Sequence, residues 1–145
     1  MQEYVVGFLH NNSAVVLIEK NRPEWQAGLL NGVGGHIESH DASPHDAMVR
    51  EFKEETGVYV SPWEHFLTLE GTQARVFCYA ATGARGTNAI NKVQTETDEV
   101  IHRVYFRDLH NRDVVPNLRW IIPIMRQRDK YSPVTVEFHE STKGN

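Results

Sequence analysis

Apolar residues along the chain fall into short runs that predict strands, interrupted by two stretches with helical character. Tyr4–Asn11 and Ala14–Lys20 are rich in β-branched and other apolar residues, and Asn12 and Ser13 are typical turn residues. These two runs are expected to form a β-hairpin. The same pattern predicts further strands at Val58–Val60, His65–Gly71, Ala74–Ala81, Val100–Phe106 and Pro133–Phe138.

The strongest helical signal covers Pro44–Thr56. Ser43 is a favourable N-cap residue, Pro44 suits the first helical position, and Asp46 three residues after Ser43 resembles a capping box. Gly57 is well placed to end the helix, because glycine readily takes the left-handed conformation found at that position. We therefore expect a helix with a defined start and a defined end.

A second helix is expected at Leu118–Arg128, where Pro123 should either kink the helix or mark a late start. The polar segment Thr82–Asp98 between the two helices is expected to be a long loop. Strands outnumber helices, and the two helices lie far apart in sequence, which favours a layered α+β domain. The 145 residues suit one domain, covering residues 1–145.

Composition and charge narrow the class of protein. Hydrophobic residues make up 40% of the chain and charged residues 23%, as in soluble globular proteins. The net charge is −4 with histidine neutral, so we expect no sequence-specific nucleic-acid partner, and a phosphate-bearing substrate would need a local cation. The N-terminus lacks a signal-peptide pattern, and no apolar run reaches membrane length. A cytoplasmic protein without a membrane partner is therefore expected.

Cysteine and histidine offer little metal chemistry. The one cysteine, Cys78, lies in an apolar run and is expected to be a buried, inert thiol. The chain has eight histidines, but none shows the spacing of a zinc site. Carboxylates are therefore the main candidates for holding a metal.

Three glutamates converge on the first predicted helix. Glu51, Glu54 and Glu55 are related as i, i+3 and i+4, so their carboxylates share one face, where each like-charged pair costs about 0.2–0.5 kcal/mol. They lie in the C-terminal half of the helix, where the helix dipole also disfavours anions. The one cation in that turn, Lys53, points away from this face and does not offset the repulsion. A divalent cation such as Mg²⁺ or Mn²⁺, which prefers oxygen ligands, would relieve the repulsion.

A solvated acidic surface is the competing interpretation, because acidic runs on helices are common. Two neighbouring features favour a binding site instead. The glycine-rich loop before the helix ends at Gly34 and Gly35, where the backbone can approach a ligand closely. Arg50 precedes Glu51 and could orient a carboxylate through a bidentate hydrogen bond.

The segment from Gly35 to Val58 resembles the Nudix box, G-x5-E-x7-R-E-U-x-E-E-x-G-U, in which U is an apolar aliphatic residue. Five strict matches at ~1/15 each agree by chance on the order of once in a million start positions. They are Arg50, Glu51, Glu54, Glu55 and Gly57. Gly35 and Val58 also match, whereas Phe52 is aromatic. Asp41 stands in place of the first glutamate, with eight residues instead of seven before Arg50, which leaves its role open.

By this resemblance the chain is identified as a member of the Nudix hydrolases, which cleave a nucleoside diphosphate linked to another group with Mg²⁺ or Mn²⁺. The resemblance implies a Nudix-type α/β/α sandwich with a mixed β-sheet between helices. It also implies that Glu51, Glu54 and Glu55 bind the metal, helped by the backbone carbonyl of Gly34, and that Arg50 orients Glu51. A metal held there would neutralise diphosphate charge and acidify a bound water.

A further acid is expected from Thr95–Val100. The similarity of this stretch to that of Nudix enzymes acting on oxidised purine nucleotides implies that Glu99 is a fourth metal ligand. A solvated loop is the alternative, since Glu96 and Asp98 are neighbouring acids. As general base, Glu51 is the first choice and Glu99 the second. The candidate catalytic residues are Arg50, Glu51, Glu54 and Glu99.

Similarity to MutT-type members of the family also implies where the substrate binds. Asn31 and Asn117 match positions that contact the base, and Gly35 lies where the backbone would approach the substrate. Asn31 could equally be a turn residue before Gly32, and Asn117 a helix N-cap. Trp120 is expected in the core more than on a base. The candidates for phosphate contact are Lys20, Arg22 and Arg75.

The function expected from this resemblance is Mg²⁺-dependent hydrolysis of a (deoxy)nucleoside triphosphate, including one with an oxidised purine, to a monophosphate and pyrophosphate. ADP-ribose, a nucleotide sugar or a dinucleoside polyphosphate is an alternative substrate for the same chemistry. A non-catalytic domain that senses nucleotides is a further alternative, which the three box glutamates disfavour. Both a monomer and a homodimer are compatible with the sequence.

Overall fold

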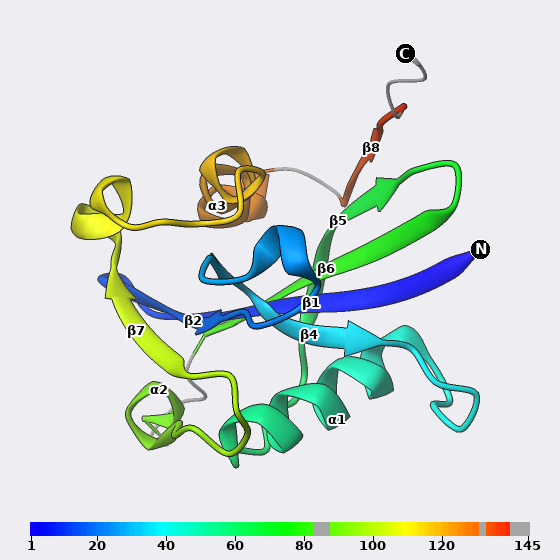
Figure 1. The fold of residues 1–145 in the computed structure, drawn as a ribbon. Coiled ribbons are helices and arrows are strands. Elements are labelled where there is room, and N and C mark those ends of the chain that lie inside the picture. Colours follow the sequence, from blue (N-terminus) through cyan, green and yellow to red (C-terminus); the bar gives the residue numbers. More distant parts are fainter. Residues whose placement is uncertain (83–87, 131–132, 140–145) are drawn as a thin grey trace.

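A mixed β-sheet of eight strands lies between helices on its two faces (Figure 1). The structure, a computed structural model, describes residues 1–82, 88–130 and 133–139 of the chain. The strands are β1 (Gln2–His10), β2 (Ala14–Glu19), β3 (Leu30–Asn31), β4 (Val33–His36), β5 (Glu64–Glu70), β6 (Ala74–Thr82), β7 (Ile101–Tyr105) and β8 (Val134–Glu137). The helices are α1 (Pro44–Thr56), α2 (Ala89–Lys92) and α3 (Leu118–Arg126), with 3₁₀ turns η1 (Glu24–Gln26), η2 (Phe106–Asn111) and η3 (Arg128–Lys130).

The inner strand β1 organises the sheet. It pairs antiparallel with β2 and β4 and parallel with β6, which continues to β5 and β8. On the other side, β2 pairs with β3 and β7. The predicted hairpin of β1 and β2 is confirmed, with His10 opposite Val15. The pairing of β4 with β1 places the glycine-rich segment directly against α1, which packs on both strands.

Two apolar clusters fill the space between the sheet and the helices. On the face covered by α1 and α2, Met48 and Phe52 pack with Val5 and Leu9 of β1. On the opposite face, Phe8 of the same strand packs beneath α3, because successive strand residues point to opposite sides. The buried residues of α3 are Leu118, Ile121, Ile122 and Met125. The predicted α+β sandwich, with a mixed sheet between helices, is confirmed.

Helix α1 begins and ends where its sequence signals predict. The hydroxyl of Ser43 accepts the backbone N–H of Asp46 at 3.1 Å, and Pro44 is the first helical residue. Gly57 takes the left-handed conformation with φ of 78°, and its N–H donates to the carbonyl of Lys53. The glutamates of the helix are therefore held at a fixed register between two well-defined caps.

Two details of the predicted secondary structure are wrong. Val58–Val60 is not a strand, because the chain leaves α1 in irregular conformation and buries Val60 in the α1-side core. The segment Thr82–Asp98 is not loop throughout, because α2 forms within it and buries Ala89. Residues 83–87 of that segment lie outside the described residues. In both segments, the burial of an apolar side chain, Val60 or Ala89, sets a backbone conformation that the local sequence pattern does not determine.

Helix α3 starts at Leu118, so a late start at Pro123 does not occur. Pro123 lies inside the helix and is exposed, while the opposite face packs on the sheet. A proline at this position leaves the carbonyl four residues earlier without its helical partner. The apolar burial on the other face therefore outweighs that loss, and the helix ends at Arg126 instead of Arg128.

Two further sequence expectations can be compared with the fold. Cys78 is buried in β6, as predicted, and burial raises the pKa of its thiol to about 12, so the thiol is protonated and inert. Among the described helices, none is long and apolar enough to cross a membrane.

Candidate active site

Glu51 is the most enclosed of the three helix glutamates. It lies on the inner side of α1 and is only 9% exposed. A Cβ atom on Gly35 of β4 would lie 2.7 Å from Oε1 and 2.8 Å from Oε2 of Glu51, closer than real Cβ contacts. Glycine at position 35 is therefore required for this carboxylate to occupy its place. Gly34 is required for another reason, since its Cβ would collide with the carbonyl oxygen of Val5.

Arg50 connects the glutamates to the loop before the helix. Its Nε and Nη2 donate to the two oxygens of Asp41 at 2.9 and 2.8 Å. Its Nη1 donates to Glu51 at 3.0 Å and to Glu54 at 3.3 Å. The bidentate hydrogen bond to a carboxylate that the sequence suggests for Arg50 is therefore present. Asp41 receives it, and Glu51 is held by one shared donor.

Asp41 thus has a defined place despite the extra residue in the box. Its side chain is 3% exposed, and Oδ2 also accepts the backbone N–H of Glu38 at 2.8 Å. The hydrogen bonds from Arg50 outweigh the opposing effect of burial and hold the pKa of Asp41 at about 2. This carboxylate is therefore charged at neutral pH and fixes the guanidinium from which Glu51 takes its hydrogen bond.

Glu54 and Glu55 lie further toward solvent. The side chain of Glu54 is 56% exposed, whereas Glu55 is half-buried and accepts the hydroxyl of Thr97 at 2.8 Å. Burial raises the pKa of both Glu51 and Glu55, and the charges of neighbouring glutamates raise it further. Arg50 opposes this effect at Glu51. The cluster therefore has one internal counter-ion, the guanidinium of Arg50, which the sequence interpretation had treated only as an orienting group.

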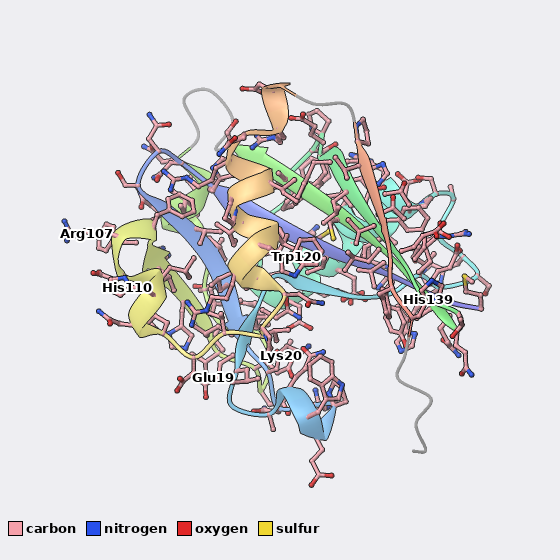
Figure 2. The ribbon with its side chains drawn as sticks, turned by 90° about the horizontal axis from the view of Figure 1, so that it is seen from above. Glu19, Lys20, Arg107, His110, Trp120 and His139 are labelled. Atoms are coloured by element: carbon pink, nitrogen blue, oxygen red, sulfur yellow. The ribbon has the colours of Figure 1, made fainter. Side chains whose placement is uncertain are left out.

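Glu99 comes from the loop before β7 and is buried, with a side chain only 4% exposed. Its carboxylate accepts Lys20 Nζ at 3.1 Å and the backbone N–H of Asn21 at 2.6 Å. Figure 2 shows Lys20 where β2 ends and the chain turns toward η1. Glu96 and Asp98 are exposed, so the solvated-loop interpretation fits these neighbours but not Glu99.

The donor set is chemically suited to a hard divalent cation, because carboxylate oxygens are the ligands that Mg²⁺ and Mn²⁺ prefer. The charge of Glu99 raises the pKa of Glu55, so the acids of the loop and of α1 act on one another. Among the residues described, no three His, Cys, Asp or Glu side chains are already arranged around one metal position. Glu51 and Glu54 instead share Arg50. The residue types therefore suit a divalent cation. The Glu54 side chain is exposed, so it is free to rotate toward a bound metal.

The two asparagines assigned to base recognition differ in their contacts. Asn31 lies in β3, where its Oδ1 accepts the N–H of Gly32 at 2.8 Å and its Nδ2 donates to Gln26 Oε1 at 3.1 Å. Asn117 is exposed at the start of α3, and its side chain makes no capping hydrogen bond with the described helix. The local bond that competes with base recognition is thus present at Asn31 and absent at Asn117. Trp120 packs partly buried on the α3-side core, as predicted (Figure 2).

The three candidates for phosphate contact are separated by the fold. Arg75 of β6 is bound to Glu70 at 2.8 Å and to Glu3 at 3.0 Å across neighbouring strands. Lys20 and Arg22 instead lie beside the buried acid of the late loop, at 3.1 and 3.8 Å. Only these two of the three cations are therefore brought to the glutamates.

Sequence reasoning missed three groups that hold site residues. The hydroxyl of Thr97 donates to Glu55, 42 positions away. The backbone N–H of Asn21 donates to Glu99, 78 positions away. The side chain of Gln26 accepts a hydrogen bond from Asn31, 5 positions away. The first two pairs carry no sequence signal, since no local pattern relates residues so distant. Gln26 is polar and lies five residues before Asn31, a candidate for base contact, so its polarity was the one available hint.

Comparison with known proteins agrees with the resemblance. A family model described as the NUDIX domain matches residues 2–124. No curated protein matches the sequence. The match includes the sheet strands β1 to β7, α1 with its glutamates, and most of α3.

Solved structures share the fold at low sequence identity. The NUDIX domain of Shewanella oneidensis NrtR complexed with ADP ribose is 19% identical, with a TM-score of 0.72 over 87% of this chain and 86% of that chain. A MutT structure from a study of Aliivibrio salmonicida and Vibrio cholerae is 22% identical, with a TM-score of 0.69, over 87% and 98%. A MutT protein from Bacillus halodurans is 18% identical, with a TM-score of 0.72, over 100% and 94%.

These identities establish likeness of fold, while the family match rests on the sequence itself. Nudix hydrolases generally use divalent metal ions, in keeping with the carboxylates gathered on α1. The match and the hydrolase neighbours support a pyrophosphohydrolase enzyme. The chain belongs to the Nudix family.

Proposed function

We propose that the chain hydrolyses nucleoside triphosphates with Mg²⁺ or Mn²⁺, taking a (deoxy)nucleoside triphosphate, including one with an oxidised purine, as its main substrate. Water would attack phosphorus, and the phosphoanhydride bond would break to release a nucleoside monophosphate and pyrophosphate. One observation carries the proposal: the Glu51 carboxylate is enclosed by Gly35 and held by Arg50, with further acids beside it.

Glu51, Glu54, Glu55 and Glu99 would hold the metal, together with the backbone carbonyl of Gly34. When bound, the metal would neutralise diphosphate charge and acidify a water molecule. The raised pKa values of Glu51 and Glu55 support this assignment, because buried acids that repel one another gain from an added cation.

Glu51 is our choice for the general base, with Glu99 second. Glu51 is enclosed beside Gly35 and held by Arg50, and a fixed position suits a group that takes a proton from the attacking water. Glu99 already accepts hydrogen bonds from Lys20 and Asn21, so its oxygens are engaged. Arg50 would act as a positioning residue that orients the Glu51 carboxylate.

Asn117 and Asn31 would recognise the base, with the backbone at Gly35 approaching the substrate. The exposed amide of Asn117 can offer both a donor and an acceptor to a purine edge. The amide of Asn31 offers less freedom, since a base would have to replace or add to its contact with Gln26. Asn117 is therefore the stronger candidate for discrimination between bases.

ADP-ribose is the second candidate substrate, because the similar NrtR domain was solved with ADP ribose bound. A nucleotide sugar or a dinucleoside polyphosphate would use the same phosphoanhydride chemistry. A non-catalytic nucleotide sensor is a third possibility. The presence of all three box glutamates, one of them buried beside Gly35, argues against that role.

A substrate panel tests the proposal. The purified protein is incubated with Mg²⁺ and canonical or oxidised (d)NTPs, ADP-ribose, nucleotide sugars and dinucleoside polyphosphates, and released phosphate and pyrophosphate are measured. We expect release of pyrophosphate from a nucleoside triphosphate, and we expect Glu54→Gln to abolish this activity. The control variant Glu70→Gln removes a charge on β5, where Glu70 pairs with Arg75, and should retain the activity. Preference for ADP-ribose would replace the first substrate class by the second. Absence of turnover with both Mg²⁺ and Mn²⁺ would contradict the enzyme itself.

A further inference from the structure

Both oxygens of the Glu99 carboxylate are engaged by the segment that follows β2. Oε1 accepts a hydrogen bond from Lys20 Nζ at 3.1 Å, and Oε2 accepts the backbone N–H of Asn21 at 2.6 Å. The side chains of Lys20 and Glu99 are only 17% and 4% exposed, so this ion pair is largely closed to water. Any metal that uses Glu99 therefore competes with these contacts for its oxygens.

The two contacts differ in how easily they can be released. The N–H of Asn21 belongs to the backbone, and its side chain is also tied to the carbonyl of Asp98 at 2.8 Å. The backbone of Lys20 is fixed as well, because it exchanges hydrogen bonds with Gly28 and Leu29. The ammonium of Lys20, by contrast, ends a flexible four-carbon side chain. Oε1 of Glu99 is therefore the oxygen that can be freed without moving the backbone.

Lys20 acts on a second acid of the site. Burial raises the pKa of Glu55, the charge of Glu99 raises it further, and the charge of Lys20 lowers it. Arg22 is less closely involved, because its side chain is 65% exposed and pairs with Asp98 at 2.6 Å, with Glu99 Oε2 further away at 3.8 Å. Lys20 is thus the nearer and better enclosed of these two cations.

An ammonium and a divalent cation on the same oxygen oppose one another. Both are positively charged, and charges of the same sign repel strongly where little water screens them. A buried carboxylate also needs a partner at all times, because an uncompensated buried charge is strongly destabilising. An exchange of one cation for the other satisfies both conditions at Glu99.

We propose that Lys20 is a resident cation of the metal site and must leave Glu99 before that carboxylate can bind a divalent cation. This inference rests on the proposed function, since it takes Glu99 as a metal ligand. Before a metal binds, Lys20 compensates the buried carboxylate and lowers the affinity of the site for metal. When Glu99 takes up a metal, the ammonium turns away toward solvent. An acid whose oxygens are already engaged can serve as a ligand in this way.

The affinity of the full chain for Mn²⁺, measured by electron paramagnetic resonance without nucleotide, tests this competition by its sign. Lys20→Met keeps the length of the side chain and removes its charge, so Kd should fall at least about fivefold. A lysine that only held the loop in place would have the opposite effect, because its loss would raise Kd. Lys20→Arg keeps the charge and should not lower Kd.

Two controls show whether Lys20 acts through Glu99. Arg22→Gln removes an exposed charge near the same carboxylate and should change Kd by less than about twofold, because exposed ion pairs contribute little. Lys20→Met should lower Kd in the wild-type background and leave it unchanged in the Glu99→Gln background. An equal gain in affinity in both backgrounds would contradict displacement from Glu99.

Acylation of the wild-type chain tests the displacement without relying on the fold of a variant. Mn²⁺ should raise the labelling of Lys20, measured by mass spectrometry relative to exposed Lys53, at least about threefold, since an unpaired lysine keeps its head in water. The inference is overturned if labelling does not rise or if Lys20→Met binds Mn²⁺ no more tightly. When Glu51→Gln still weakens Mn²⁺ binding in that case, the proposed metal site stands. A wild-type chain that does not bind Mn²⁺ would contradict both.

Discussion

Replacing Gly35 by alanine tests whether the place of the Glu51 carboxylate matters. The added methyl would lie 2.7–2.8 Å from the carboxylate carbon and both oxygens, so the side chain or β4 must shift. Overpacking of this kind costs about 1–3 kcal/mol of stability, and the flexible glutamate favours the lower end. Displacing a reacting group by about 1 Å can cost about 100-fold in rate. We therefore expect a fold that survives and a kcat/KM lowered by about two orders of magnitude.

The assay measures kcat/KM for the best nucleoside triphosphate together with the free energy of unfolding in urea. Gly71→Ala is the matched control, because its Cβ would approach the ring of Phe138 to a similar 2.6 Å in the turn between β5 and β6. The control should lose stability and keep activity. Full activity in Gly35→Ala, or an equal loss of activity in the control, would refute the assignment of Glu51.

Three further predictions follow from the contacts of the site. Asp41→Asn should lower the free energy of unfolding in urea by about 1.5–3 kcal/mol by weakening charge-assisted hydrogen bonds to Arg50; a change below about 0.5 kcal/mol would contradict the pairing. Glu51 and Glu55 have pKa values raised above 4.5 in the folded chain, so their contribution to stability is complete below pH 4.5 and is lost as pH rises through the folded-state values. Melting temperatures in EDTA should show this loss and Mg²⁺ should reverse it, whereas identical curves would exclude metal binding at these acids. Asn117→Ala should raise KM more for preferred than for poor substrates, and a uniform rise would indicate a role in starting α3.

The first helix was predictable because its signals are local. Ser43, Pro44 and Gly57 act within one turn of the helix ends, and the structure places those ends at the predicted residues. The i, i+3, i+4 spacing likewise fixes three glutamates on one side of α1. Local rules failed at Val58–Val60, where burial against α1 and not strand pairing sets the conformation.

The contacts that shape the site could not be derived from one sequence. Asp41 reaches Arg50 only because the loop before α1 folds back onto the helix. The local sequence does not predict the path of that loop. The engagement of Glu99 by Lys20 joins residues 79 positions apart. The sequence could supply the residue types of the donor set, whereas tertiary packing decided that Glu51 is enclosed and Glu54 exposed.

Direct binding of Mn²⁺, followed by electron paramagnetic resonance without any substrate, tests the central claim that these glutamates hold a divalent cation. The wild-type chain should bind Mn²⁺, and Glu51→Gln should raise Kd at least about tenfold by removing one charged ligand. The control variant Glu70→Gln removes a carboxylate that pairs with Arg75 on the sheet, and it should bind Mn²⁺ as the wild type does. Equal Mn²⁺ affinity in the wild type and Glu51→Gln would contradict the account.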